Sequence, residues 1–285
     1  MSNNTCPVCH SHLCAGYQKW HFVCKRCSYE KADLQPAINL QSAHEPIDED
    51  ARETGLRELR TSNFKELLAT IKRFKPSGGR LLDVGCAHGW FLDIAGNDFE
   101  VLGLEPDRKI SEATLQRGLP VRTGYFPDAL ADSEKFDVLV FNDVIEHIDN
   151  IRLTLESCYD RLNENGLLVL NLPSSSGFIY KVSKMFCRFG YTGFFDRMWQ
   201  KDFPSPHVHY FNLCNLLVFL VHNGFSIETK GTLSSLRLAG LYNRVSHTYN
   251  RTRIANMCIY ISAALLLPLL KICPGDIIYV VSKRK

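Results

Sequence analysis

The sequence lacks an excess of either charge: 33 Lys and Arg stand against 30 Asp and Glu, for a formal net charge of +3. Charge alone therefore gives no argument for nucleic-acid binding. Low-complexity runs and internal repeats are also absent, and with 45% hydrophobic and 22% charged residues the composition excludes a disordered, collagen-like or coiled-coil protein. A chain of 285 residues can bury a large core, in two domains or in one with an appendage.

The first five residues, Met1 to Thr5, lack the basic and apolar segments of a secretory signal. We therefore expect a cytoplasmic protein without a disulfide framework, although the chain contains 11 cysteines. The uncharged stretch 254–270 has 17 residues, whereas a membrane-spanning helix needs about 20. A spanning helix there would also separate the strand expected at 276–282 from its sheet.

Two interpretations of 254–270 stay open. One is a helix on a membrane surface, which would bring the protein to the inner face of a membrane. The other is a helix that packs on protein, in the core or in a dimer contact. The flanking cations, which suit anionic headgroups, are Arg244, Arg251, Arg253 and Lys271.

Four cysteines stand apart by their spacing. They form two C-x-x-C pairs, Cys6 with Cys9 and Cys24 with Cys27, separated by 14 residues. This is the spacing of a zinc ribbon, in which four thiolates complete a tetrahedral shell around a structural zinc ion. The alternatives are accidental clustering or a redox pair, and His10 and His12 are spare ligands. The other seven cysteines are expected to be small core residues.

From residue 80 onward, short apolar strands alternate with helices. The expected strands are 80–84, 100–104, 121–123, 136–141, 167–172, 225–231 and 276–282. The expected helices between them are 91–95, 107–117, 151–162 and 212–223, and a further helix at 54–75 precedes the first strand. This alternation predicts a largely parallel α/β sheet with helices on both faces. The expected organisation is a ribbon at 1–40, a linker at 41–53 and an α/β domain at 54–285, with insertions at 173–206 and 232–275.

A glycine loop follows the first of these strands, and a carboxylate ends the second. The loop runs Asp83-Val84-Gly85-Cys86-Ala87-His88-Gly89, and Glu105 lies 20 residues after Gly85. Such a pair suits the ribose of a dinucleotide or of an adenosyl group. The dinucleotide fingerprint G-x-G-x-x-G is absent. The spacing instead resembles motif I, D-x-G-x-G-x-G, of class I S-adenosylmethionine methyltransferases. Ala87 replaces the middle glycine, which we expect to be tolerated provided that its φ is negative.

Segments 136–148 and 163–172 are similar to the fourth and fifth strands of that family, and the resemblance covers about 54–231 and 276–282. It implies a Rossmann-like sheet of seven strands, mostly parallel with an antiparallel last strand, and S-adenosylmethionine as cofactor. The cofactor contacts that it implies are Asp83, Gly85, Cys86, Ala87, Gly89, Glu105, Pro106, Tyr125, Phe126, Asn142 and Asp143. For Tyr125 and Phe126, plain core packing is an equal alternative.

Methyl transfer to oxygen requires an aligned nucleophile and a base for its proton. His147 follows the fourth strand, and the pair Glu146-His147 is similar to one in ubiquinone-pathway O-methyltransferases, which implies a base or a divalent-metal role. Its alternative role is to orient the helix that starts after Asp149. His209, near His207, is the second catalytic candidate, with hydrogen bonding to a backbone turn as its alternative.

The insertion 173–206 contains nine aromatic and five basic residues. We expect a lid over the acceptor site, or a subdomain with its own small core. The sequence therefore predicts a methyltransferase for a small-molecule or lipid-linked acceptor. Two other functions stay open: an RNA methyltransferase whose ribbon grips RNA, which the balanced charge disfavours, and a non-catalytic adaptor whose methyltransferase fold is degenerate at Ala87.

Overall fold

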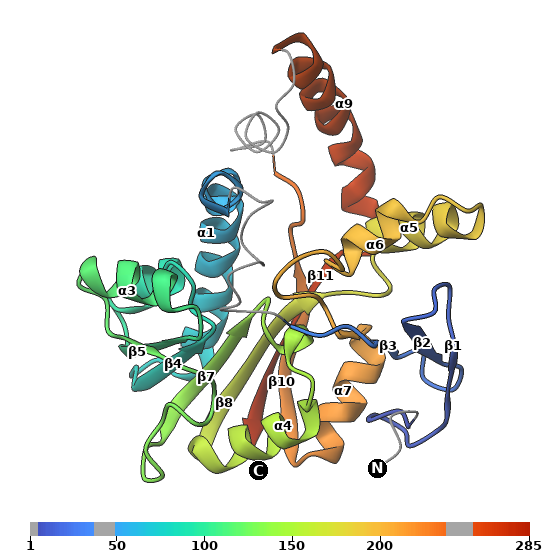
Figure 1. Cartoon of the computed structure of the whole chain (residues 1–285). Helices are drawn as coiled ribbons and strands as arrows, with labels where there is room; N and C mark the ends of the chain where they lie inside the picture. Colours follow the sequence, from blue (N-terminus) through green and yellow to red (C-terminus); the bar gives the residue numbers. More distant parts are fainter. Residues whose placement is uncertain (1–4, 37–48, 238–252) are drawn as a thin grey trace.

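The computed structural model describes residues 5–36, 49–237 and 253–285 (Figure 1). Its centre is a seven-stranded sheet in the order β10-β11-β8-β7-β4-β5-β6. The strands are β4 (Arg80–Val84), β5 (Glu100–Glu105), β6 (Val121–Thr123), β7 (Phe136–Asn142), β8 (Leu162–Pro173), β10 (Phe225–Leu233) and β11 (Ile277–Arg284). Strands β4 to β8 pair in parallel, and β11 runs antiparallel to both of its neighbours. The predicted Rossmann-like sheet is thereby confirmed.

The apolar strands are buried because helices cover both faces of the sheet. In β7, Leu139 and Phe141 join a core cluster with α4 (Ile151–Arg161) and α7 (Leu213–His222). Val138 and Val140 point to the other face, toward α1 (Glu49–Phe74) and α2 (Trp90–Ala95). The helix α3 (Arg108–Gln116) follows β5. A strand that is covered on both sides needs this continuous apolar run.

Two element boundaries differ from the sequence prediction by five residues. Helix α1 begins at Glu49 and not at residue 54, so it includes the end of the expected linker, whose first part lies outside the described residues. Glu49 and Asp50 lie in the first turn, where acidic side chains are favourable, which explains why the helix begins before residue 54. Strand β8 begins at Leu162, five residues earlier than expected.

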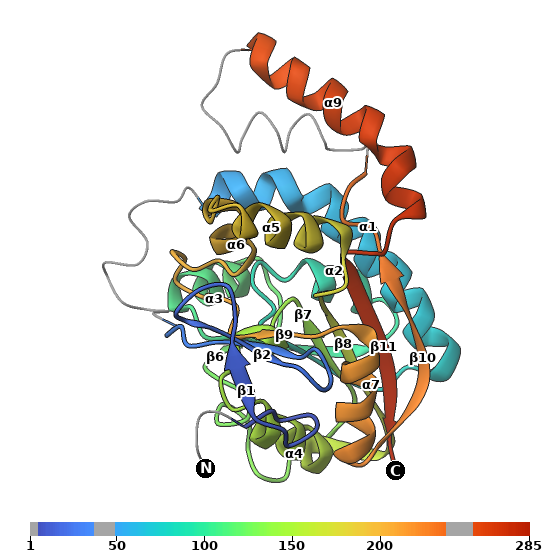
Figure 2. The same ribbon diagram turned by 90° about the vertical axis from the view of Figure 1, so that its right-hand side faces the viewer.

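The cysteine-rich segment forms a small second sheet. Its strands β1 (Leu13–Ala15), β2 (His21–Cys24) and β3 (Glu30–Ala32) are antiparallel, and β9 (His209–Tyr210) completes the sheet from far along the chain (Figure 2). The backbone pairs are Glu30 with Tyr210 and Lys31 with His209. The ribbon is therefore joined to the α/β part by a shared sheet, which the sequence had not indicated.

The two insertions differ in how they meet the rest of the molecule. The insertion 173–206, which we call the lid, contains α5 (Phe178–Arg188) and α6 (Gly193–Met198). Helix α9 (Arg253–Ile272) extends away from the sheet in both views (Figures 1 and 2). Within the described ranges, none of the helices has the length and hydropathy needed to span a bilayer.

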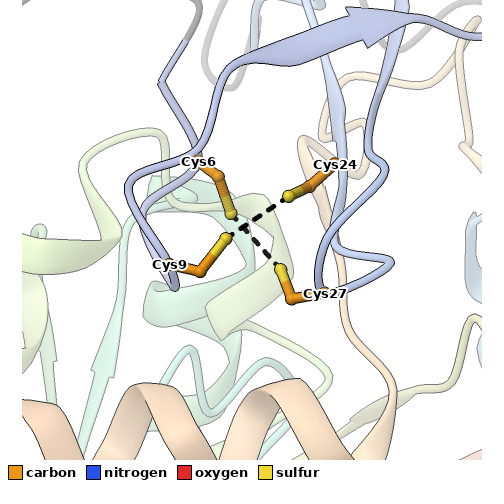
Figure 3. Close-up of side chains that lie close together, drawn as sticks. All are labelled: Cys6, Cys9, Cys24 and Cys27. Carbon is orange, nitrogen blue, oxygen red and sulfur yellow. Dashed lines mark hydrogen bonds between the residues drawn. The ribbon is translucent and has the colours of Figure 1, made fainter.

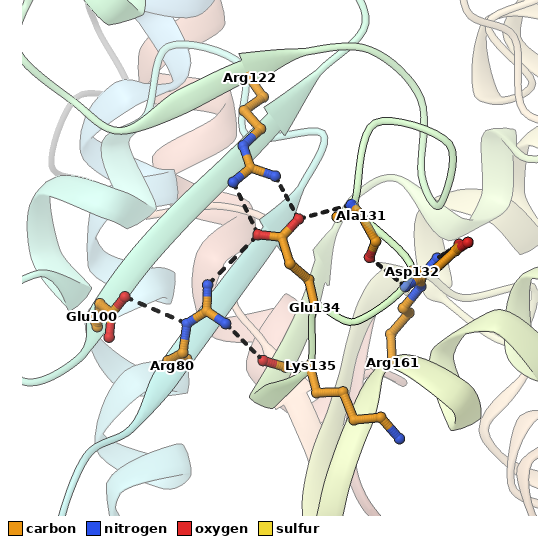
Figure 4. Close-up of polar contacts among 8 residues, drawn as sticks. All are labelled: Arg80, Glu100, Arg122, Ala131, Asp132, Glu134, Lys135 and Arg161. Atoms are coloured by element: carbon orange, nitrogen blue, oxygen red, sulfur yellow. Dashed lines mark hydrogen bonds and ion pairs between the residues drawn. The ribbon is translucent and has the colours of Figure 1, made fainter.

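An ionic network ties together the strands near the amino ends of β4 and β5 (Figure 4). Arg122 donates two hydrogen bonds to Glu134, at 2.6 and 2.9 Å, and Arg80 lies 3.4 Å from Glu100 and 3.7 Å from Glu134. The hydrogen bonds from Arg122 lower the pKa of Glu134 to about 2. This network lies at the end of the sheet opposite to the carboxyl ends of the same strands, where the candidate functional site lies.

The scattered cysteines are only partly core residues. Cys86, Cys158 and Cys187 are buried, as predicted. The prediction is wrong for Cys214 and Cys258, which are exposed. They lie in α7 and α9, where one face of each helix is turned away from the core.

Candidate functional site

A cavity of about 460 Å³ lies at the carboxyl ends of β4, β5 and β7. Ten of the eleven predicted cofactor residues line it: Asp83, Gly85, Cys86, Ala87, Glu105, Pro106, Tyr125, Phe126, Asn142 and Asp143. The eleventh, Gly89, precedes α2 with φ +72° and does not line the cavity. A Cβ there would lie 2.5 Å from Leu119, so this glycine serves the packing of the loop.

Glu105 connects the glycine loop to the end of β5. Its Oε2 accepts a hydrogen bond from the Ala87 amide at 2.9 Å, and its Oε1 accepts one from the Asp107 amide at 2.8 Å. The amides of Gly85 and Cys86 donate to the Leu104 carbonyl at 2.8 and 2.9 Å. The loop after the first strand and the carboxylate at the tip of the second are therefore joined by hydrogen bonds.

Ala87 corrects one expectation. Its φ is +45°. We had expected an alanine to be tolerated at this position provided that its φ is negative. A left-handed conformation costs an L-residue roughly 1–2 kcal/mol. The Ala87 amide bonds to Glu105, and the Ala87 carbonyl accepts from the Thr114 hydroxyl at 3.0 Å. These bonds hold the alanine in the conformation that a glycine would take, so the loop keeps its shape.

The floor of the cavity is acidic. Asp83 is buried, and its carboxylate accepts a hydrogen bond from the Asn142 amide at 3.3 Å. Burial, with a further contribution from the charge of Glu105, raises the pKa of Asp83 to about 8. Asp143 lines the same cavity. A ligand with positive charge would compensate these carboxylates.

The two aromatic candidates differ in their surroundings. Tyr125 is 54% exposed, so core packing is wrong for it. Phe126 is half-buried and packs edge-on against Phe141, with ring centroids 5.7 Å apart. Both line the cavity, so Phe126 serves the core and the cavity wall at once.

His147 also lines the cavity, at the end of a short 3-10 turn, Ile145–His147. Its Nδ1 lies 2.9 Å from the Pro206 carbonyl oxygen. Because a carbonyl can only accept, Nδ1 carries a proton, so that in the neutral ring Nε2 carries the lone pair. The ring packs edge-on against His207, with centroids 4.7 Å apart. The geometry gives His147 the tautomer that a base or a metal ligand needs.

Glu146, His147 and His207 form a second candidate metal set, with ligand atoms within 4.8 Å of one another. Glu146 is fully buried, and neither of its carboxylate oxygens has a hydrogen-bond partner among the described residues. Burial, reinforced by the charge of Asp143, raises the pKa of Glu146 well above its usual range. A cation or a hydroxyl from a ligand would give this carboxyl group a partner.

A second cavity, of about 530 Å³, adjoins the first. Five residues line both: Arg60, Phe64, Asp143, Gln200 and Phe203. Sequence reasoning missed four of these, Asp143 being the exception. Arg60 and Phe64 belong to α1, and the sequence of that helix gave no sign that it lines the site. Gln200 and Phe203 belong to the lid.

His209 is corrected by the structure from a catalytic to a structural residue. It is 2% exposed and does not line the first cavity. Its Nε2 donates to the Ile148 carbonyl at 2.9 Å and to the Asp149 carbonyl at 3.2 Å, while its Nδ1 is bonded to the Tyr29 hydroxyl. Burial lowers the pKa of His209 to about 4. A neutral ring with both nitrogens engaged cannot serve as the base.

The four ribbon cysteines converge as their spacing predicts (Figure 3). The Sγ atoms of Cys6 and Cys27 are 3.5 Å apart, those of Cys9 and Cys24 are 3.4 Å apart, and all four lie within 4.8 Å. With Zn–S bonds of about 2.3 Å, a tetrahedral zinc ion separates its sulfurs by about 3.8 Å. The donor set therefore fits zinc. His10 is not part of this cluster, and its Nε2 lies 3.3 Å from Arg152.

Together, the sheet order, the glycine loop and the acidic cavity define a Rossmann-like methyltransferase domain. The chain belongs to the family described as "Methyltransferase domain", whose model matches residues 56–230. It is similar to the mitochondrial ubiquinone biosynthesis O-methyltransferase of Rattus norvegicus, with 25% identity over 60% of this chain and 51% of that protein. It is also similar to a ubiquinone biosynthesis O-methyltransferase of Chelativorans, with 31% identity over 33% of this chain and 40% of that protein.

The matched part thus spans about half the length of these curated relatives, or less. Among solved structures, a SAM-dependent methyltransferase from Thermotoga maritima has a TM-score of 0.56 at 15% identity and covers 84% of this chain and 96% of its own. The magnesium protoporphyrin IX methyltransferase of Synechocystis with bound SAH has a TM-score of 0.53 at 15% identity and covers 81% and 86%. At such identities the likeness establishes the fold.

The left-handed Ala87 generates a stability prediction. Ala87→Gly should stabilise the protein by up to about 1 kcal/mol, because relief of the strain exceeds the added entropy of the unfolded chain. Ala113→Gly, the same change at an exposed position inside α3, should instead destabilise it by about 1 kcal/mol. Urea unfolding measures both free energies. Equal destabilisation by the two variants would contradict this reading of the loop.

Proposed function

We propose that the protein transfers the methyl group of S-adenosylmethionine to a small-molecule or lipid-linked acceptor, by in-line attack of the acceptor on the sulfonium methyl. The observation that carries the proposal is the contact between Ala87 and Glu105, which brings the glycine loop and an acidic strand tip to one cavity. In this arrangement Glu105 would accept hydrogen bonds from the ribose hydroxyls. The family membership and the SAH-bound structural neighbour support the same cofactor.

The electrostatics of the cavity support a cationic cofactor. Asp83, Glu105 and Asp143 line it, and burial together with the charge of Glu105 raises the pKa of Asp83. In the proposal, Asp83 holds the amino group of the methionyl end, Asn142 and Asp143 lie beside the sulfonium, and Pro106, Tyr125 and Phe126 flank the adenine. Ala87 keeps the loop conformation of a glycine, which argues against the adaptor alternative.

For the acceptor, the proposal uses the second cavity and His147. Apolar side chains of Leu56, Leu59, Ile179 and Met198 line that cavity, next to Glu146 and His207. The Nε2 of His147 would take the proton of an acceptor hydroxyl, or would bind a divalent cation together with Glu146 and His207. The curated relatives are named as O-methyltransferases of ubiquinone biosynthesis, which favours an oxygen atom on an apolar acceptor.

The four cysteines of the ribbon would hold a structural zinc ion in this proposal. Closed sites of four cysteines contribute to folding and leave no open position for a substrate. The ion would fix the turn after β2 relative to the turn before β1, and thereby the small sheet that ends in β9.

The acceptor class is tested by supplying tritiated-methyl S-adenosylmethionine to cell extract with the purified protein and separating lipid, glycan, RNA and protein fractions. We expect the label in the lipid or small-molecule fraction. Label in RNA alone would replace the proposed acceptor by a nucleic acid, and tight cofactor binding with no label in any fraction would favour the adaptor.

His147 generates a catalytic prediction. His147→Asn should lower the initial rate of label transfer by roughly 10²–10⁴-fold, because the acceptor proton loses its base or its metal. The affinity for S-adenosylhomocysteine, measured by calorimetry, should stay within a few-fold of the parent value. The control is His222→Asn, an exposed position at the end of α7. Retention of the full rate in His147→Asn would leave this residue with an orienting role only.

Asp83 generates a pH prediction. Below its pKa of about 8 the free protein holds this carboxyl group protonated, and a bound cation favours the ionised form. Cofactor binding should therefore release a proton, and affinity should rise as pH increases from 6 to 8, by up to about tenfold per unit.

Calorimetry at pH 6, 7 and 8 measures this slope. Because the cofactor's own amino group also titrates, the contribution of Asp83 is the part of the slope that disappears in Asp83→Asn. Asp128→Asn, an exposed aspartate beside the same cavity wall, serves as control. An unchanged slope in Asp83→Asn would refute the assigned role.

Helix α9 supports a membrane-surface location in the proposal. Met257, Ile261 and Leu265 are exposed and four residues apart, so they lie on one face of the helix. The helix extends away from the sheet, and both flanking strands, β10 and β11, return to that sheet. In the proposal, α9 lies in the interface plane of a membrane. This would bring the protein to a lipid-linked acceptor on the cytoplasmic side of that membrane.

The double change Ile261→Glu, Leu265→Glu should lower co-sedimentation with anionic vesicles by tenfold or more, since each buried apolar side chain contributes about 1.5–3 kcal/mol. Leu115→Glu, at an exposed position of α3, should co-sediment as the parent protein does. Equal co-sedimentation of all three proteins would remove the membrane part of the proposal and leave a protein contact for this helix.

A further inference from the structure

A buried carboxylate lies between the ribbon and the lid. Glu30, in β3, is 2% exposed and receives three side-chain contacts of 2.7 Å. One comes from His21 in β2, and the other two come from Tyr180 and Lys184 in α5 of the lid. A single side chain of the ribbon therefore holds two successive turns of a lid helix.

The protonation states of this cluster are set by its geometry. The Tyr17 amide donates to Nδ1 of His21 at 3.0 Å, so Nε2 carries the proton that is donated to Glu30. Burial alone would raise the pKa of Glu30, but the hydrogen bond from His21 and the charge of Lys184 outweigh it, and the pKa is lowered. Glu30 is thus an ionised, fully bonded carboxylate inside the molecule.

The aromatic side chains around Glu30 come from both segments. The His21 ring packs against Phe195 and Trp199 of the lid, with centroid distances of 5.0 and 5.2 Å. Trp20 lies 5.8 and 5.7 Å from the same two rings. The lid therefore shares its core with the ribbon, which contributes Ala32, Trp20 and Leu34 to the same cluster.

The same lid residues lead directly to the cavity wall. Gln200 and Phe203, which line both cavities, follow Trp199 in the chain. The Trp199 carbonyl accepts a hydrogen bond from the His207 amide at 2.9 Å, and Gln200 lies 2.9 Å from the His207 ring nitrogen Nε2. A displacement of Trp199 would move the wall that the two cavities share. Among the described residues, the apolar cluster around Trp199 includes none from the glycine loop 83–89.

We propose that Glu30 is a positioning residue: through Tyr180 and Lys184 it holds the lid in the conformation that forms the acceptor cavity, and so makes acceptor binding depend on the ribbon. The inference rests on the proposed function only where it assigns the second cavity to the acceptor. The link from ribbon to lid is a statement about the fold and can be measured without an acceptor.

Hydrogen–deuterium exchange of the full chain tests that link. Glu30→Gln keeps the shape of the side chain and removes its charge, and Lys184→Met removes one lid partner. Both should raise the exchange rate of peptides from 178–206 by roughly tenfold or more, as expected for loss of a buried charged hydrogen bond. Peptides from 80–106 should exchange as in the parent protein. Lys181→Met, an exposed lysine on the same helix, is the matched control and should change neither region.

The double variant Glu30→Gln, Lys184→Met should exchange no faster in 178–206 than Glu30→Gln alone, because both changes break the same contact. The label-transfer assay, run with serial dilutions of the extract fraction, measures the apparent KM for the acceptor. For Glu30→Gln this KM should rise tenfold or more, while the KM for S-adenosylmethionine should stay unchanged. A general folding defect would move both constants and both peptide regions.

Two results overturn the proposal: parent-like exchange of 178–206 in Glu30→Gln, or faster exchange in 80–106 to the same extent. A failure of the proposed function would give a different result from these two exchange results. A protein that does not bind S-adenosylhomocysteine at all would refute the methyltransferase proposal, while the exchange response of the lid to Glu30→Gln would still stand.

Discussion

The hydrogen bond from the Ala87 amide to the Glu105 carboxylate is the contact on which the candidate site depends. It joins the loop after one parallel strand to the tip of the next, and it holds a non-glycine residue at a φ of +45°. Without it, the loop would lose a hydrogen bond to the tip of β5, and the carboxylate would lose one of the two backbone amides that orient it. The same hydrogen bond therefore maintains the strained conformation of Ala87 and the orientation of Glu105.

The two halves of the site are built in different ways. The half next to the glycine loop is formed mainly by residues at the ends of β4, β5, β6 and β7 or just after them, so the parallel sheet brings these residues together. The half proposed for the acceptor takes residues from α1 and from the lid, and the lid in turn packs on the ribbon. Changes in the lid can therefore alter the second cavity and the wall that it shares with the first, while the glycine loop lies outside the lid.

The features that could be predicted from the sequence are those that depend on residues close together in the chain. The strand 80–84, the antiparallel last strand and ten cavity residues follow from local periodicity and from the motif, since these features are encoded within a few residues. The pairing of β3 with β9, the burial of His209 and the approach of α1 to the cavity join segments far apart in the chain. No local pattern encodes such contacts. The sign of φ at Ala87 likewise follows from bonds to Glu105 and Thr114, not from the identity of alanine.

The most direct test of the central claim is a crystal structure of the protein with S-adenosylhomocysteine. The account predicts the ribose hydroxyls within hydrogen-bonding distance of Glu105 and the homocysteine amino group beside Asp83. Ligand bound elsewhere, or a ribose that makes no contact with Glu105, would contradict it.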